Sequence, residues 1–163
     1  MNKVKIAIII LINLILQATL ISRLPVYSVY ANFSIPILVA LSIGFGEYIG
    51  SISGLIIGLI EDLIFSPVIG VRALIYFTAG FLIGSSEAGI NKKDPRSGMI
   101  ITGFLTLYYT IVYYIVIFIT QGQIDPSYLK GPIFIELVLN VITYFIIFKI
   151  FNKIFEFPKF RLR

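Results

Sequence analysis

Long apolar segments separated by short polar ones run along the whole of this 163-residue chain. A helix that crosses a bilayer needs about 20 predominantly apolar residues. By that measure the pattern predicts six spans, some of them short, over residues 4–22, 33–47, 48–65, 68–86, 98–120 and 133–151. The loops between them leave no room for a soluble module. We therefore expect an all-α integral membrane protein with a single polytopic domain over residues 1–163.

The basic residues gather at alternate ends of these predicted spans. With a cytoplasmic N-terminus, six spans place ten of the thirteen Lys and Arg residues on the cytoplasmic side: Lys3, Lys5, Lys92, Lys93, Arg96, Lys149, Lys153, Lys159, Arg161 and Arg163. Arg23 and Lys130 fall outside, and Arg72 falls within a span. This bias predicts a multi-pass protein of the cytoplasmic membrane with both termini cytoplasmic.

The same distribution explains the net charge of +5. Because the basic residues lie at span ends, we interpret them as topology signals rather than as a nucleic-acid surface. Basic residues at the cytoplasmic ends favour contact with anionic lipid. Membrane lipid, and no nucleic acid, is therefore the expected non-protein partner.

The first span begins with Lys3 and Lys5, as a signal peptide does. Its apolar part is longer than a usual signal-peptide core and has no convincing cleavage site, so we predict an uncleaved first helix that ends before Pro25. Asn13 and Gln17 lie on one face of that helix and are expected to contact a neighbouring helix.

The composition excludes several kinds of chemistry. The chain is 58% hydrophobic and 13% charged, whereas a soluble domain carries about 25% charge. It contains no Cys and no His, which removes thiolate nucleophiles, imidazole bases and the commonest zinc ligands. We expect no enzymatic activity, no metal site and no cofactor.

Four glycines recur at every fourth position in the predicted third span: Gly46, Gly50, Gly54 and Gly58. Residues at this spacing stack on one face of a helix, and in lipid such a face lets two backbones approach closely. The spacing does not identify the helix that packs there. We favour a helix of this chain over a helix of a partner protein.

Three charged residues interrupt the hairpin of the third and fourth spans. Glu61 and Asp62 precede a break at Ser66 and Pro67, and Arg72 follows it. At about 1.5 Å per residue, the acids and Arg72 lie at similar depths, so Arg72 is expected to contact Asp62 or Glu61. An unpaired charge there would cost on the order of 2.5–3.5 kcal/mol. Ser66 is predicted to cap the fourth helix, with Pro67 in its first turn.

Two roles remain open for this charged trio: a lock on the hairpin, or contact with a ligand, a proton path or a partner helix. Because Glu61 and Asp62 are adjacent, they point to different helix faces and do not form a carboxylate dyad. A second polar pair, Glu136 and Asn140, lies one turn apart near the start of the last span. We expect it at the membrane interface, where an acid suits a helix N-terminus.

The stretch from Gly54 to Leu74 resembles the family of the bacterial rod shape-determining protein MreD. The family's pattern is a Gly-Leu-x-x-Asp stretch, a short turn, Gly-x-x-Ala-Leu and a further glycine-rich helix, matched here by Gly58, Leu59, Asp62, Gly70, Ala73, Leu74 and Gly80. The remainder of the chain agrees in length and hydropathy.

This resemblance implies a non-enzymatic membrane scaffold of the cell-wall elongation machinery, which maintains rod shape. The implied partner is MreC, a bitopic protein with a large extracytoplasmic domain, together with the actin-like MreB, the polymerase RodA and a class B penicillin-binding transpeptidase. The implied fold is a six-helix bundle like that of the substrate-binding S-components of energy-coupling-factor transporters.

A vitamin-binding S-component is the alternative function. Such subunits often carry an Ala-x-x-x-Ala face for their transport partner, and Ala7 and Ala18 are not so spaced. The outer loops are short, and Trp and His are missing from any ligand pocket. These points favour the scaffold.

Overall fold

The computed structural model describes residues 2–19, 31–121 and 132–155. These residues form six α-helices and one short 3-10 helix: α1 (Asn2–Thr19), α2 (Ser34–Phe45), α3 (Glu47–Phe65), α4 (Val71–Ser85), η2 (Glu87–Gly89), α5 (Pro95–Gln121) and α7 (Pro132–Ile154). Each predicted span overlaps one α-helix, and the crossing of a membrane by all six stays a prediction. Residues 20–22 of the first span, Arg23, Pro25, Lys130 and the tail residues Lys159, Arg161 and Arg163 lie outside the described residues.

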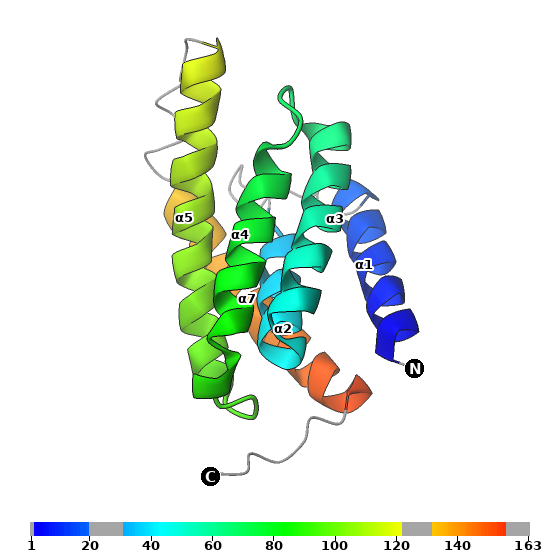
Figure 1. Cartoon of the computed structure of the whole chain (residues 1–163). Helices are drawn as coiled ribbons and strands as arrows, with labels where there is room; N and C mark the ends of the chain where they lie inside the picture. The colour runs from blue at the N-terminus through cyan, green and yellow to red at the C-terminus, as the bar shows by residue number, and fades with distance from the viewer. Residues whose placement is uncertain (1, 20–30, 122–131, 156–163) are drawn as a thin grey trace.

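The shortest α-helix, α2, is the centre of the bundle. It contacts each of the other five α-helices, and every residue from Ser34 to Ile43 is buried. Its sequence is apolar on all sides, as expected for a helix surrounded by protein. In Figure 1, α3 and α4 stand in front of α2 as an antiparallel hairpin, with α1 beside α3 and α5 beside α4.

The start of α1, the connection from α4 to α5 and the end of α7 meet at one end of the bundle (Figure 1), and apart from Arg72 the basic residues of the described chain belong to these segments. We call this the basic end and define it by Lys3, Lys5, Lys92, Lys93, Arg96, Lys149 and Lys153. Two hydrogen bonds join its parts: Lys5 Nζ donates to the Ile154 carbonyl at 3.1 Å, and Lys92 Nζ donates to the Gly44 carbonyl at 3.2 Å. The placement of this end in the cytoplasm stays a prediction.

Apolar side chains cover the outside of the bundle, while many polar ones are buried inside it. Large apolar residues are exposed on all the long helices, for example Ile8, Leu63, Phe104, Ile119 and Ile142. Three helices, α3, α5 and α7, are long and apolar enough to cross a membrane, and α2 and α4 are shorter apolar helices. This inverted distribution suits a bundle surrounded by lipid.

The predicted start of the fourth helix is wrong. α4 begins at Val71, and its N-cap is Gly70, with a φ of 102° in the left-handed region that favours glycine. Ser66 does not cap it. The Ser66 hydroxyl instead accepts from the Val68 N–H at 3.3 Å and donates to the Val68 carbonyl at 2.8 Å, forming a local turn.

Candidate functional site

Three of the predicted glycines bring the backbones of α3 and α4 into contact. A Cβ atom built on Gly58 would lie 2.6 Å from the Ala73 Cα, and one built on Gly50 would lie 2.6 Å from the Gly80 carbonyl oxygen. A Cβ atom on Gly54 would overlap the backbone carbonyl of Tyr76. Any larger residue would therefore push the two helices apart, and α4 fills this face of α3.

Gly46 differs from the other three and corrects the predicted ladder. It lies between α2 and α3, with a φ of 86° that an L-residue rarely adopts. Gly46 therefore allows the chain to turn between the two helices. It is not a helical residue of α3 and does not belong to the glycine face formed by Gly50, Gly54 and Gly58. It does lie next to α4, because a Cβ atom on Gly84 would come 2.6 Å from its carbonyl carbon.

Asp62 caps α4 from the neighbouring helix α3. Its side chain is fully buried, and its Oδ2 accepts the backbone N–H groups of Gly70 at 2.9 Å and Ala73 at 3.2 Å. The first backbone N–H groups of a helix have no partner within the helix, and a carboxylate there also suits the helix dipole. Asp62 takes the place that the sequence assigns to Ser66.

Arg72 lies close to both acids rather than to one. Its Nη1 is 3.7 Å from Glu61 Oε2, and its Nε is 3.9 Å from Asp62 Oδ1. These distances allow charge attraction but exceed those of direct hydrogen bonds. The guanidinium carbon also lies 5.3 Å from the ring centroid of Tyr113 and 5.9 Å from that of Phe65, within cation–π range. Arg72 is thus held by charge and by two rings.

Glu61 connects three other helices to α3. Its Oε1 accepts from the Ser34 hydroxyl of α2, and its Oε2 accepts from the Tyr76 hydroxyl of α4 at 3.2 Å. The Ser34 hydroxyl in turn accepts from Asn13 Nδ2 of α1 at 2.7 Å. Each of these four side chains is buried.

The chain of hydrogen bonds continues from Tyr76 to the remaining helices. Asn32, just before α2, donates from Nδ2 to the Tyr76 hydroxyl at 2.8 Å and from its backbone N–H to Asn140 Oδ1 of α7 at 2.9 Å. Asn140 Nδ2 donates to Thr106 Oγ1 of α5 at 3.1 Å.

All six α-helices therefore contribute to one connected set of side chains. We call it the interior polar network and define it by Asn13, Asn32, Ser34, Glu61, Tyr76, Thr106 and Asn140. A buried polar group without a partner is costly, and more so in a region without water. The network gives each helix a bonding partner on another helix, so it favours one arrangement of the six.

The predicted contact of Asn13 with a neighbouring helix is confirmed. Asn13 bonds to Ser34, while Gln17 accepts the Phe33 N–H at 3.1 Å and donates to the Ala31 carbonyl at 3.3 Å. Asn13 thus contacts the first residue of α2, and Gln17 contacts the residues just before it.

The sequence predicts Glu136 and Asn140 together at the membrane interface, but Asn140 has a different environment. This residue is fully buried in the network, whereas Glu136 is partly exposed; the two side chains interact with each other. Tertiary packing rather than depth along the helix decides the environment of Asn140.

Sequence reasoning missed the network residues Asn32, Ser34, Tyr76 and Thr106. One available signal was the spacing of Thr102, Thr106 and Thr110, which places three hydroxyls on one face of α5. All three are buried, and each donates to the backbone carbonyl four residues earlier. A polar stripe on an otherwise apolar helix indicates the side that faces protein.

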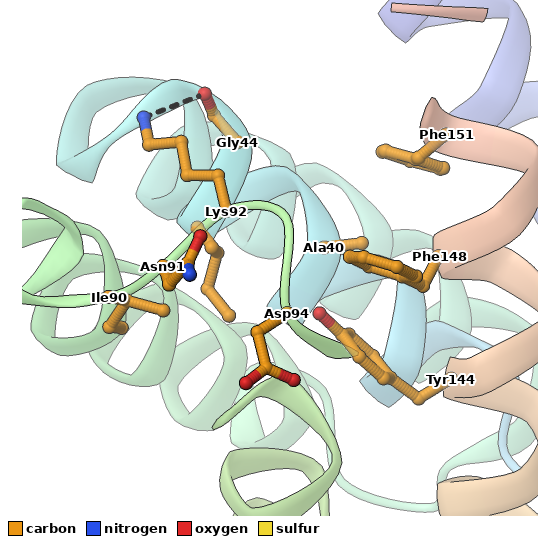
Figure 2. Close-up of a pocket in the computed structure, with 10 residues that line it drawn as sticks. Ala40, Gly44, Ile90, Asn91, Lys92, Asp94, Tyr144, Phe148 and Phe151 are labelled. Carbon is orange, nitrogen blue, oxygen red and sulfur yellow. Dashed lines mark hydrogen bonds between the residues drawn. The ribbon is translucent and has the colours of Figure 1, made fainter. Parts of the chain in front are cut away.

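A small pocket lies at the basic end, away from the network (Figure 2). It lies between the loop of residues 90–94, Ala40 of α2, and Tyr144 and Phe148 of α7. Its volume is about 20 Å³, which is room for one water molecule. It is too small for a vitamin-sized ligand.

The fold and the network define the class of this molecule: an α-helical membrane protein whose helices are joined by buried polar side chains. The family model described as rod shape-determining protein MreD matches residues 1–154. The chain therefore belongs to the MreD family and has a role in determining rod cell shape. No curated protein and no solved structure matches it.

Proposed function

We propose that this protein is a non-enzymatic membrane scaffold of the bacterial cell-wall elongation machinery and that it binds the membrane helix of MreC. MreB, RodA and a class B penicillin-binding transpeptidase are the further partners. The protein acts in the cytoplasmic membrane as a six-span bundle with both termini cytoplasmic. Family membership supports the shape-determining role, and the interior polar network carries the scaffold assignment.

The network supports a scaffold because its buried side chains bond to one another across helices. Glu61 bonds to Ser34 and Tyr76, and Asn140 bonds to Asn32 and Thr106. A transport subunit needs polar groups that turn toward a ligand, whereas these turn toward neighbouring helices. The charged trio acts in the same way, as a lock on the α3–α4 hairpin.

The partner helix uses a different face from the glycines of α3, because α4 already fills that face. Two residues that carry the family resemblance point outward instead: Leu59 is 42% exposed and Leu74 is 64% exposed. Packing within the bundle does not account for leucine at these positions. We place the MreC helix against the outer face of the hairpin at Leu59 and Leu74.

The test is a pull-down of the tagged full-length protein from its native membrane in mild detergent, with the co-purifying proteins identified. Recovery of an MreC-like bitopic protein is the expected result. Recovery of two ATPases with a shared membrane coupling subunit would overturn the scaffold and identify an energy-coupling-factor S-component.

A matched pair of variants tests the docking face. The double variant Leu59→Ala/Leu74→Ala should lower the recovery of MreC. The control variant Leu11→Ala/Leu107→Ala removes the same atoms from two other helices, α1 and α5, at side chains exposed by 58% and 37%, and should leave recovery unchanged. Equal recovery with both variants would show that the partner docks elsewhere.

A further inference from the structure

An apolar groove runs between α5 and α7 on the outer surface of the bundle. Its volume is about 450 Å³, and it is lined by Met99, Ile100, Gly103, Phe104, Leu107, Leu137 and Val141. It is open along one side and almost wholly apolar. We call it the α5–α7 groove.

Gly103 creates the depth of this groove. A Cβ atom built there would meet the Val141 Cγ2 at 3.8 Å, an ordinary van der Waals distance. An alanine would therefore fit, so close helix packing does not require glycine at this position. The exposed side chains of Ile100 and Phe104 line the groove on either side of Gly103 in the sequence. Because Gly103 has no side chain, the groove is an apolar channel that is deepest at this residue.

Arg96 lies on the same face of α5 at the basic end. Arg96, Ile100, Gly103 and Leu107 follow the helical spacing of a single face. Gly103 is seven positions after Arg96, which corresponds to about 10 Å along the helix. The Arg96 side chain is exposed, and its backbone N–H is bonded to Asp94 Oδ1 at 2.9 Å. Within the described ranges no acidic side chain forms an ion pair with Arg96.

A positive charge at one end of an apolar channel suits a molecule with an anionic headgroup and an apolar chain. We propose that the α5–α7 groove binds an anionic phospholipid, with an acyl chain along Gly103 and the phosphate at Arg96. An arginine fork suits phosphate oxygens, and the other cations of the basic end attract the same lipid class. This inference is independent of the partner proposed above.

The absence of tryptophan from the chain provides a clean probe. Phe104→Trp places a single tryptophan in the groove, and Phe77→Trp places one on the exposed outer side of α4. These positions lie nine residues from the start of α5 and eight from the end of α4, so their depths from the basic end are similar. The full-length variants are reconstituted into vesicles that mix an ordinary phospholipid with its dibrominated form, which quenches nearby tryptophan.

The measured quantity is the relative affinity of phosphatidylglycerol over phosphatidylcholine at each tryptophan. We expect a preference for phosphatidylglycerol in the groove of about fivefold over the control position, the factor that one arginine near an anionic lipid contributes. Arg96→Ala, added to Phe104→Trp, should remove that preference. Gly103→Leu fills the channel and should weaken quenching by either lipid. Circular dichroism verifies that each variant is folded.

Equal preference at Phe104→Trp and Phe77→Trp would overturn the site and leave only general attraction to the basic end. An unchanged preference after Arg96→Ala would overturn the assignment of the headgroup. Failure of either lipid to quench the groove tryptophan, with normal quenching at the control, would mean that a protein segment fills the groove.

Discussion

Asp62→Ala is the most informative single change, because the side chain has two separable roles. Its Oδ2 caps α4 through the N–H groups of Gly70 and Ala73, and its charge lies near Arg72. Asp62→Asn keeps an oxygen for the cap and removes the charge. Asp62→Ala removes both. The difference between the two variants measures the cap.

The magnitude follows from the two lost hydrogen bonds. Hydrogen bonds to a charged group contribute about 1.5–3 kcal/mol each in soluble proteins, but side-chain bonds in membrane proteins average about 0.6 kcal/mol. For two bonds to a buried carboxylate we expect Asp62→Ala to lower the free energy of unfolding by about 2 kcal/mol. That is roughly a 30-fold change in the folding equilibrium. Asp62→Asn should lose less than half as much.

The assay is unfolding of the purified protein in mixed micelles with increasing SDS, followed by the loss of helical circular dichroism. If Asp62→Asn is as damaging as Asp62→Ala, the charge dominates and the capping argument fails. A double reversal, Asp62→Arg/Arg72→Asp, sharpens the test. If only the charge pair mattered, the double reversal would partly restore the stability lost in Asp62→Ala. Because arginine has no acceptor for the hydrogen bonds from the Gly70 and Ala73 N–H groups, we expect no such recovery.

The remaining predictions use the same unfolding assay. Gly54→Ala should destabilise the bundle by more than about 2 kcal/mol, since its Cβ atom would overlap the Tyr76 backbone; Gly89→Ala, where the added atom meets nothing within 4 Å, is the neutral control, and equal effects would contradict the close contact. Asn140→Leu should cost about 1–3 kcal/mol by leaving the Asn32 N–H unpaired, and unchanged stability would mean that this bond is dispensable. Tyr76→Phe removes a hydroxyl that bonds two side chains and should cost about 1 kcal/mol; a stable variant would exclude that hydroxyl as a link in the network.

The candidate site was predictable where a local pattern carries the information. The four-residue spacing of Gly50, Gly54 and Gly58 identifies a close-packing face whichever helix fills it. The position of Arg72 relative to the two acids follows from helical rise across a short turn. These features depend on the geometry of one helix or one hairpin.

The cap on α4 shows where local rules fail. Ser66 followed by Pro67 is a favourable helix start, but Asp62 on the adjacent helix supplies the acceptor, and Gly70 supplies the left-handed turn. A capping residue that comes from another helix has no fixed spacing to the helix that it caps. Sequence spacing therefore identified the wrong residue.

By itself, the sequence determined the helical class, the number of apolar segments, the clustering of basic residues at alternate segment ends and the family resemblance. Each depends on composition or short spacing along the chain. Only the tertiary structure decided that α2 lies at the centre and that Asn13, Glu61 and Asn140 belong to one connected network. Their partners are far apart in the sequence, and a lone polar residue in an apolar helix does not indicate which neighbour it will meet. That choice is made when six helices pack, because a buried polar side chain is stabilised by a partner on a neighbouring helix.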